Sequence, residues 1–400
     1  MKRNFEMNSI TTEKTKQAID ILNEKGIDAW LIFVRETSAF EDPVLPLIYG
    51  IDLTWQTALL FSRNGERIAV IGHYEAEAAR RTGLFTEVIP YHQSIQPDLL
   101  KVLQNLDPKT IAINYSIDDV HADGLSHGMY LLLNKLLAGT PYDDRLISAQ
   151  EIIAALRGRK TPAEIGRIRQ AIATTEEIYR RTFEFVRPGL TEQHVYDFMQ
   201  DQMNTFKVSA AWDVANCPIV NTGPDSEVGH VGPTERQIAP GHILHLDFGV
   251  KQNDYCSDIQ RVAYILRPGE TQPPAPVQKG FETVKNAIEE TVKKMMPGMK
   301  GVDIDQVARE YVVQAGYPEF MYATGHHLGR TAHDGAGILG PRWERYGNTP
   351  EYRLEAGHVY TVEPGVAVAG YGYVGIEEDV LVTDHGAEFL SQPQRDLILI

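Results

Sequence analysis

Two aspartates flank one polar turn at a spacing suited to holding a cation. Asp247 lies in an apolar stretch that begins at Ile243, and Asp258 follows the polar turn 251–254. The stretches on both sides are typical of strands, so the segment predicts a β-hairpin. If the turn is centred between residues 252 and 253, Asp247 and Asp258 lie directly opposite each other and both carboxylates share one face.

A second hairpin repeats this arrangement with glutamates. Glu363 follows one strand-like stretch, a glycine-rich turn lies near Gly370, and the next stretch carries Glu377. A turn centred on Gly370 places Glu363 opposite Glu377, again with both side chains on one face. The chain therefore predicts two facing pairs of acids in one region.

Such pairs need a positive charge nearby. Like charges opposite each other on paired strands are destabilising, and apolar neighbours predict that these acids are buried, where an unpaired carboxylate is strongly unfavourable. Four carboxylates carry four negative charges, which two divalent cations would neutralise. The alternative is that the acids face solvent on amphipathic strands. One hairpin alone favours that alternative, whereas two favour a metal site.

Four histidines supply a further kind of ligand. His326, His327 and His333 lie in one glycine-rich segment, 324–335, and His230 lies in another loop-like segment before the first acidic hairpin. A neutral imidazole binds metals, and a protonated one stabilises an oxyanion. The spacing alone does not tell which of the four is the ligand.

The other histidines are expected to have structural roles. His245 shares a strand face with Asp247, and packing behind the metal-binding residues is its expected role. His242 and His358 each follow a turn glycine and are expected at the surface. Six more show no partner pattern: His73, His92, His121, His127, His194 and His385.

The elements that must position these residues fall into two parts. In the first part a helical pattern over 12–25 precedes an apolar run at 29–34, typical of a buried strand, and strands then alternate with helices. This alternation predicts an α/β layer. The charged stretch 156–162, which contains a proline, breaks the pattern and predicts a boundary between domains 1–158 and 159–400.

The second domain is predicted to be α+β. Helices are expected at 163–186 and 192–205, the latter with Thr191 as its N-cap, and again at 277–296 and 303–314. Beyond residue 210 the chain is otherwise rich in strands. All the candidate ligands lie here, so an antiparallel sheet built from the hairpins must bring them together.

Composition limits the classes of function. The 400-residue chain has 38 basic and 54 acidic side chains and a net charge of −16, which argues against a nucleic-acid partner because the chain repels phosphate. Cys217 and Cys256 have neither metal-finger nor redox spacing, which fits a reducing compartment. The chain has no apolar stretch of bilayer length and no signal-like N-terminus, so we expect a cytoplasmic protein without a membrane partner.

Taken together, these residues resemble the pita-bread metallopeptidases, which include methionine aminopeptidase, aminopeptidase P and prolidase. The order of residue types Asp, Asp, His, Glu, Glu matches, and segments 325–334, 362–365 and 376–379 are similar to the histidine and glutamate motifs of the family. The resemblance covers 159–400. Residues 1–158 resemble, more weakly, the creatinase-type N-terminal domain of aminopeptidase P and prolidase, which methionine aminopeptidases usually lack.

The resemblance implies a role for each residue. It implies two divalent metal ions, with Mn expected first and Co, Zn or Fe as alternatives. Five residues would hold them: Asp247, Asp258, His326, Glu363 and Glu377. His333 becomes a partner of the transition state, and His230 a further catalytic histidine. The resemblance also implies a homodimer that acts on small peptides.

Two positions depart from the proline-specific members of the family. Those enzymes usually carry an arginine two residues before the last glutamate and a tyrosine four residues after the glutamate of the Glu-Pro motif. Here these positions are Gly375 and Ala367. Their joint change predicts a rebuilt environment around the first aspartate, using Tyr371, Tyr373 or His245, and leaves proline preference open.

The expected function is a dinuclear-metal-dependent exopeptidase that releases N-terminal residues or cleaves dipeptides, with Xaa-Pro bonds as candidates. Glu363 is the candidate for carrying a proton to the leaving amine, and Arg345 or Arg353 could meet a substrate carboxylate. The alternatives are another enzyme on the same fold, either a creatinase-like amidinohydrolase or a metal-dependent lyase, and a non-catalytic binding module. The amidinohydrolase and the binding module typically lose ligands, and this chain keeps all five.

Overall fold

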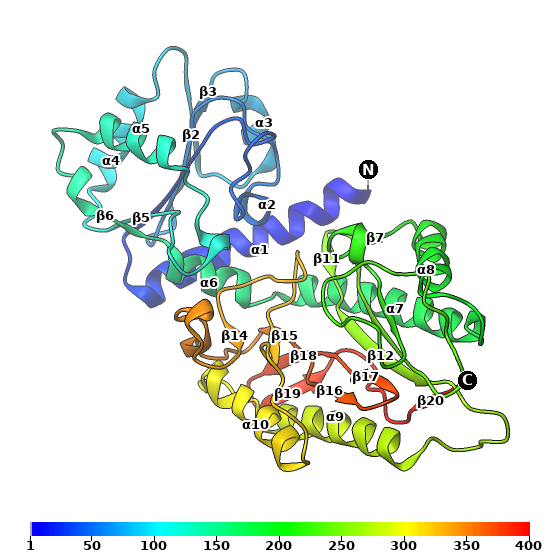
Figure 1. Ribbon diagram of the computed structural model, residues 1–400. Coiled ribbons are helices and arrows are strands. Elements are labelled where there is room, and N and C mark those ends of the chain that lie inside the picture. The colour runs from blue at the N-terminus through cyan, green and yellow to red at the C-terminus, as the bar shows by residue number, and fades with distance from the viewer. Residues whose placement is uncertain (1) are drawn as a thin grey trace. The chain divides into compact units, whose positions relative to one another are not determined.

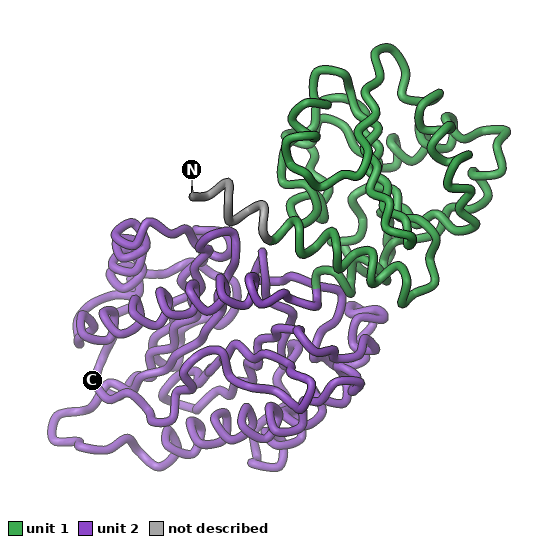
Figure 2. The backbone as a smooth tube through the Cα atoms, turned by 180° about the vertical axis from the view of Figure 1, so that it is seen from behind, with its two compact units in different colours: residues 1–157 green, residues 158–400 purple. Residues whose placement is uncertain are grey.

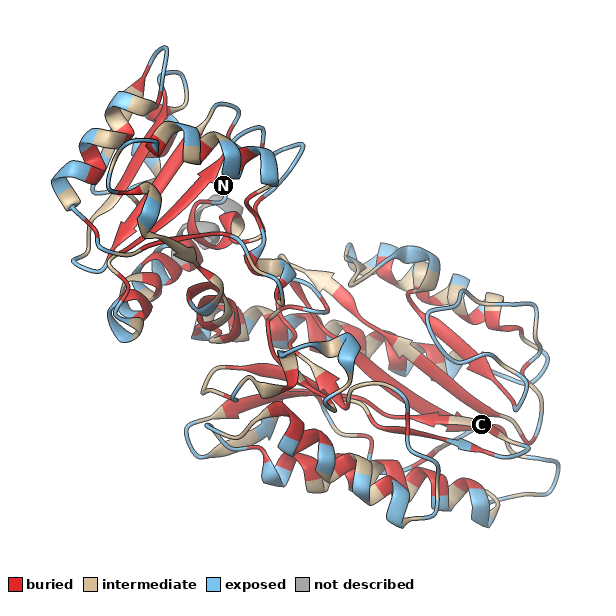
Figure 3. Ribbon diagram, turned by 60° about the vertical axis from the view of Figure 1, so that its left-hand side comes forward, coloured by how far each residue is buried: buried red, intermediate tan, exposed pale blue. Residues whose placement is uncertain are grey.

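Two compact units make up the chain, Met1–Arg157 and Gly158–Ile400 (Figure 2). The structure is a computed structural model that describes the backbone of residues 2–400 and the side chains of residues 10–400. In both units the strands are mostly buried, while many helices show one buried and one exposed face (Figure 3). Each unit therefore has a hydrophobic core of its own.

The first unit is built on a six-stranded sheet in the order β4-β3-β2-β1-β5-β6. Its strands are β1 (Ala29–Val34), β2 (Thr57–Ser62), β3 (Arg67–Gly72), β4 (Glu87–Tyr91), β5 (Ile111–Ile113) and β6 (Leu146–Ser148). Its helices are α1 (Lys2–Lys25), α2 (Leu45–Ile48), α3 (Ala76–Thr82), α4 (Gln96–Leu106), α5 (His127–Leu137) and α6 (Gln150–Gly158). The pairs β1–β5, β3–β4 and β5–β6 are parallel, as crossover helices require. The α/β layer predicted for this part is confirmed.

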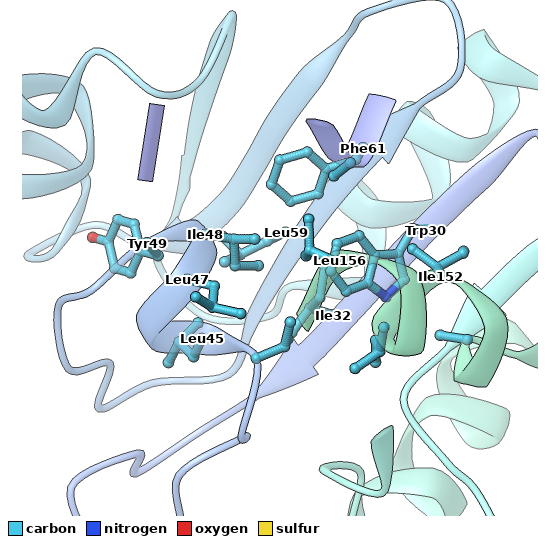
Figure 4. Packing of buried hydrophobic residues seen from close by; sticks show 14 of the residues in the cluster. Trp30, Ile32, Leu45, Leu47, Ile48, Tyr49, Leu59, Phe61, Ile152 and Leu156 are labelled. Carbon is cyan, nitrogen blue, oxygen red and sulfur yellow. The ribbon is translucent and has the colours of Figure 1, made fainter. Parts of the chain in front are cut away.

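The strand β1 is apolar along its whole length because both faces of the sheet are covered. Trp30 and Ile32 point to one side, where they pack in a cluster that includes Ile152 of α6 (Figure 4). Leu31 points to the other side and belongs to the cluster that includes Leu133 of α5. An apolar run without alternation therefore marked a strand buried on both faces.

The second unit begins with a capped helix. The Thr161 hydroxyl accepts a hydrogen bond from the Glu164 N–H at 3.4 Å, and the Glu164 carboxylate accepts one from the Thr161 N–H at 2.8 Å. This capping box starts α7 (Pro162–Phe185), with proline in the first turn. The next helix is α8 (Glu192–Phe206), and Thr191 caps it as the sequence predicted.

Short sheets form the rest of the second unit. One four-stranded sheet has the order β20-β12-β9-β8, and one three-stranded sheet has the order β15-β18-β19. β10 lies between β11 and β7, β13 pairs with β14, and β16 pairs with β17. The strands are β7 (Ser209–Ala210), β8 (Ile219–Thr222), β9 (Ile243–Phe248), β10 (Val250–Gln252), β11 (Tyr255–Cys256), β12 (Ile259–Tyr264), β13 (Gly325–His326), β14 (Ile338–Leu339), β15 (Val359–Val362), β16 (Gly365–Val368), β17 (Gly372–Gly375), β18 (Glu378–Thr383), β19 (Gly386–Phe389) and β20 (Ile398–Leu399).

Helices cover these sheets on separate sides. α9 (Ala275–Lys294) and α10 (Gly301–Gln314) lie side by side, and α9 packs on β15, β16, β17 and β19 (Figure 1). α7 and α8 contact each other and pack on β10, β11 and β8. The strand pairs are antiparallel apart from β12–β20. The α+β class with antiparallel sheets is confirmed.

The register of the first acidic hairpin differs from the prediction. Gln260, and not Asp258, pairs with Asp247, so the predicted direct opposition of the two aspartates is wrong. The turn lies at Asn253–Asp254, one residue later than predicted, where both φ angles are left-handed at 51° and 68°. Moving the turn by one residue shifts the pairing by two, which keeps both aspartates on the same face.

The register of the second hairpin is as predicted. The pairs β15–β18 and β16–β17 share one continuous register, and this register puts Glu363 across from Glu377. Gly370 lies in the turn with φ of 79°, a conformation that glycine adopts without strain.

A buried ion pair joins the two acidic hairpins. Arg261 of β12 donates to both carboxylate oxygens of Glu378 on β18, each at 3.1 Å. Arg261 also donates to the carbonyl oxygens of Glu377 and Gln392, at 3.0 Å and 2.8 Å. The two paired side chains are 8% and 1% exposed. This contact fixes β12, which follows Asp258, against β18, which follows Glu377.

Replacing Arg261 by methionine is expected to destabilise the fold strongly. Removing one partner of a buried pair leaves a buried charge and costs about 3–5 kcal/mol. The matched control is Arg169→Met, whose pair with Glu388 is 48% and 53% exposed and should contribute little. Urea unfolding followed by circular dichroism measures both. A midpoint for Arg261→Met equal to that of the control would contradict the structural role of the pair.

Candidate metal centre

The five side chains expected as ligands line one cavity of the second unit, with a volume of about 740 Å³. Each comes from a different place in the fold. Asp247 lies in β9, Asp258 directly before β12, His326 at the end of β13, Glu363 after β15 and Glu377 directly before β18. Hairpins and a short strand thus bring together residues that are up to 130 positions apart in the chain.

His326 lies among the carboxylates. Asp258, His326 and Glu377 each offer one ligand atom, and these three atoms lie within 4.8 Å of one another. The Nε2 atom of His326 is 3.3 Å from Glu363 Oε1 and 3.7 Å from Asp258 Oδ2. Its Nδ1 lies 3.2 Å from the carbonyl oxygen of His327, which can only accept, so Nδ1 carries the proton and donates. Nε2 is therefore the nitrogen with a lone pair that faces the acids.

Burial disfavours the charged form of each of these side chains. It raises the pKa of the carboxyls of Asp247, Asp258, Glu363 and Glu377, and neighbouring acids raise the pKa of the last three further. Burial lowers the pKa of His326 to about 3, so its imidazole is neutral. Four carboxyls so close together away from water must either bind protons or bind a cation.

The residues present fit divalent metal ions. Four carboxylates and one neutral imidazole form a donor set that suits hard or borderline ions. The Oδ1 atom of Asp247 is buried and has no hydrogen-bond partner among the described residues. A buried polar atom without a partner is costly, and a cation is the partner that this donor set fits.

The other histidines of the sequence analysis also reach this cavity. The ring of His333 lies edge-on to that of His326, with 4.2 Å between the centroids. His333 and His230 are exposed and line the cavity. His327 lines it too but is buried, and burial lowers its pKa well below the ordinary value. His326 thus differs from the other three histidines, because its ring lies among the carboxylates while His230 and His333 are exposed and His327 is buried.

The prediction for His358 is wrong, because its side chain is buried and not at the surface. Its ring packs against those of His327 and Tyr360, at 4.6 Å and 5.8 Å between centroids. β15 begins at the next residue and runs through the core, which carries His358 inward. His242 is partly buried, and His194 completes the cap of α8 by accepting a backbone hydrogen bond at 3.1 Å.

The sequence reasoning missed Gln260. Its Nε2 donates to Glu363 Oε2 at 3.2 Å, and the Thr361 hydroxyl donates to Glu363 Oε1 at 3.3 Å. Its Oε1 lies 2.9 Å from Nε2 of His245. With the turn placed one residue later, Gln260 lies directly opposite Asp247. The correct register of the hairpin would therefore have identified Gln260 as a neighbour of the site.

Two of the three residues proposed to rebuild the environment of the first aspartate lie at the cavity. Tyr373 is the cross-strand partner of Ala367, so a tyrosine is present on the neighbouring strand although residue 367 is alanine. His245 lies edge-on to Tyr373 at 5.2 Å between centroids and also lines the cavity. Tyr371 lies elsewhere, beneath the guanidinium of Arg267.

A second buried ion pair supports the histidine segment. Lys160 Nζ lies 3.3 Å from Asp334 Oδ2, and the two side chains are 0% and 4% exposed. The Asp334 carboxylate also accepts hydrogen bonds from the Arg330 N–H at 3.1 Å and the Thr331 hydroxyl at 3.4 Å. The segment that carries His326 is thereby tied to the start of α7.

The two arginines suggested for a substrate carboxylate do not line the cavity. Arg353 donates to the carbonyl oxygen of Gly298 at 2.5 Å. Arg345 donates to the carbonyl oxygen of Met321 at 2.6 Å, and its guanidinium stacks on Tyr346, which does line the cavity. Arg345 therefore lies beside a residue of the cavity wall but does not itself line the cavity.

Comparison with known protein families matches residues 166–384 to metallopeptidase family M24, more than half of the chain. The chain belongs to this family. Among its relatives, the Xaa-Pro dipeptidase of Pyrococcus furiosus is 30% identical over 249 residues, which cover 62% of this chain and 67% of that protein. The resemblance to this family predicted from the acidic and histidine motifs is confirmed.

Solved structures agree with the M24 assignment. The Xaa-Pro dipeptidase from Bacillus anthracis matches with a TM-score of 0.73 and 25% identity, covering 98% of this chain and 100% of that chain. An X-Pro aminopeptidase from Thermotoga maritima matches with a TM-score of 0.69 and 26% identity, covering 96% and 99%. The predicted fold class, an α/β unit followed by a pita-bread catalytic unit, is confirmed.

Membership of family M24 also confirms the predicted class of activity. The chain is a metallopeptidase, a hydrolase of peptide bonds that works with divalent metal ions. In the part of the chain that the structure describes, no helix combines the length and the apolar character needed to cross a lipid bilayer.

Divalent metal is expected to raise the melting temperature more at neutral pH than in acid. In the metal-free protein burial raises the pKa of Asp247 from 3.8 to about 7, so between these values the folded chain binds more protons than the unfolded chain. Stability contributed by this group is thus present in acid and is lost as pH rises through the window. Metal replaces the protons and removes the penalty.

Thermal melts of metal-stripped protein with and without MnCl₂, across that pH window, measure this effect. An Asp258→Asn variant, which lacks one candidate ligand, is expected to gain less from metal at every pH and to bind less of it. A metal-induced gain in melting temperature that does not change with pH would contradict the assignment of these carboxyls.

Proposed function

We propose that this chain is a dinuclear-metal-dependent exopeptidase that releases N-terminal residues or cleaves dipeptides, with Xaa-Pro peptides as its substrates. The observation that carries the proposal is the gathering of four carboxyls and one neutral histidine on the wall of one cavity. Of the carboxyls, Asp258 and Glu377 are buried, and Asp247 and Glu363 are partly buried. A Xaa-Pro dipeptidase among the relatives and a Xaa-Pro dipeptidase among the similar structures support the choice of substrate.

The proposed ligands of the two ions are Asp247, Asp258, His326, Glu363 and Glu377. Mn is the proposed metal, with Co, Zn or Fe as alternatives, because ligation dominated by carboxylates suits hard or borderline ions. When bound, such ions lower the pKa of water and polarise a carbonyl, which is the chemistry that peptide hydrolysis needs.

Glu363 is the proposed proton carrier. Hydrogen bonds from Gln260 and Thr361 hold its two carboxylate oxygens, and its side chain is 16% exposed at the cavity. From this position it would take a proton from water and pass it to the leaving amine. His230 and His333 are exposed to the same cavity and would donate hydrogen bonds to the substrate carbonyl oxygen.

We also propose a role for each of the two domains. Residues 1–158 would form a creatinase-like N-terminal domain and residues 159–400 the catalytic domain. The match to Xaa-Pro dipeptidase over 98% of this chain, both units included, supports this division of roles. We further propose that the enzyme acts as a cytoplasmic homodimer on small peptides.

Glu363→Gln is expected to abolish most activity while leaving the chain folded. Loss of a general acid–base group lowers kcat by roughly a hundredfold to ten-thousandfold. The matched control is Glu388→Gln, an exposed acid of the same unit that pairs with the exposed Arg169. Steady-state kinetics on a peptide that the wild type cleaves measures both variants. Full activity of Glu363→Gln would reject its role.

A peptide panel tests the substrate class. Wild-type protein loaded with Mn is given Xaa-Pro dipeptides, Xaa-Pro-Yaa tripeptides and the same peptides with alanine in place of proline. We expect kcat/KM for the proline peptides to exceed that for the alanine peptides by about tenfold or more, a difference of about 1.4 kcal/mol in transition-state binding. Equal values would remove the proline preference, and no cleavage with Mn, Co or Zn would reject the exopeptidase.

A further inference from the structure

A row of buried polar side chains leads across three neighbouring strands to the Glu363 carboxylate. Asn221 of β8 pairs directly with His245 of β9, and its Oδ1 lies 3.1 Å from His245 Nδ1. His245 Nε2 lies 2.9 Å from Oε1 of Gln260 on β12, and Gln260 Nε2 donates to Glu363 Oε2 at 3.2 Å. Asn221, His245 and Gln260 are 4%, 4% and 6% exposed.

The direction of these hydrogen bonds follows from the acceptor at the end of the row. As a metal ligand, Glu363 is an ionised carboxylate and only accepts, so the amide of Gln260 presents its NH₂ group to Glu363 and its oxygen to His245. The Nε2–H of His245 is then the donor to Gln260, and the neutral ring has no second proton with which Nδ1 could bond to the Asn221 oxygen. His245 therefore fixes the rotation of the Gln260 amide, and Gln260 in turn fixes one oxygen of Glu363.

The space for this row exists because residue 375 is glycine. A Cβ atom on Gly375 would lie 2.5 Å from His245 Nε2 and would overlap Gln260 Oε1 as well, the two atoms that form the hydrogen bond. Gly375 does not have a left-handed φ, so its backbone conformation does not by itself require glycine. The close approach of the His245 and Gln260 side chains is what requires glycine at this position.

Two tyrosines hold the same glutamate from its backbone side. Tyr373 packs edge-on against His245, and its hydroxyl lies 2.5 Å from the hydroxyl of Tyr322. The Tyr322 hydroxyl donates to the carbonyl oxygen of Glu363 at 3.3 Å. Both the main chain and the carboxylate of Glu363 are thus bound to one connected set of side chains.

We propose that His245 and Gln260 form a positioning pair that sets the orientation of the Glu363 carboxylate for metal binding and proton transfer, and that Gly375 is required to make room for this pair. The proposal deepens the proposed function, since it rests on the role given there to Glu363. Neither side chain is placed on the substrate. Each acts through the glutamate.

Cobalt binding tests the pair without any peptide. Metal-stripped wild type, His245→Phe, Gln260→Met and Gly375→Ala are titrated with CoCl₂ and followed by visible absorption. His245→Phe keeps an aromatic ring and removes the hydrogen bond, and Gln260→Met keeps the chain length. Loss of an outer hydrogen bond to a ligand typically costs about tenfold to a hundredfold in metal affinity, so each variant should bind Co more weakly by at least tenfold and show a changed ligand-field spectrum.

The matched control for the glycine is Gly166→Ala. Gly166 is exposed in α7, and an added Cβ there meets no atom within 4 Å. This variant should bind Co as the wild type does. If Gly375→Ala fails to fold, the two variants that leave residue 375 unchanged, His245→Phe and Gln260→Met, still decide the proposal.

Kinetics separates positioning from general loss of structure. With Mn and a cleavable peptide, the variants should lose about tenfold in kcat with KM changed less than about twofold, because the group affected acts in the chemical step. His245→Gln, whose amide can still donate, should recover part of the loss. The double variant His245→Phe/Gln260→Met should lose no more than the worse single variant, since the two act as one unit.

The outcomes distinguish this proposal from the proposed function. Unchanged Co affinity, spectrum and kcat in both His245→Phe and Gln260→Met would overturn the positioning pair and leave the exopeptidase intact. Wild-type protein that binds Co but cleaves no peptide would overturn the exopeptidase, while the Co spectra of the variants would still decide the orientation of Glu363.

Discussion

Four carboxyl groups held side by side away from water dominate the energetics of the second unit. At an effective dielectric constant of about 20, two like charges about 4 Å apart repel by about 4 kcal/mol. Several such pairs together exceed the net stability of a typical domain, about 5–15 kcal/mol. The acids can therefore share this cavity only as protonated groups or as ligands of cations. Burial of the four carboxyls and the neutral His326 both point to the same requirement.

Two buried cations near the site are paired with acids that do not line the metal centre. Arg261 is paired with Glu378 and Lys160 with Asp334, each buried and each next to the segments that carry the site. Neither of these two cations forms an ion pair with one of the four proposed carboxylate ligands. Their role is geometric, because they fix the acidic hairpins and the histidine segment against their neighbours. The ion pairs of the chain thus hold the acidic hairpins and the histidine segment in place, and bound metal is needed to neutralise the four carboxylates.

Two small residues near the site leave room for polar side chains from neighbouring strands. The cross-strand partner of Ala367 is Tyr373, which lines the cavity. The space beside Gly375 is filled by His245 and Gln260 of the adjoining sheet. Of Tyr371, Tyr373 and His245, which were expected to rebuild the environment of the first aspartate, the last two lie at the cavity.

Local signals along the chain were enough to predict the class of each unit, the long helices, the Thr191 cap and the two acidic hairpins, because hydrophobic period, caps and turn residues act over a few positions. The motifs that resemble family M24 were also visible in the sequence. The pairing of Gln260 with Asp247 depends on the tertiary structure, since one residue in a turn shifts a whole register. The tertiary structure alone buried His358, paired Lys160 with Asp334 and placed His245 beside Gly375. These contacts join segments up to 174 residues apart. A local sequence pattern does not show which distant segment will pack against it.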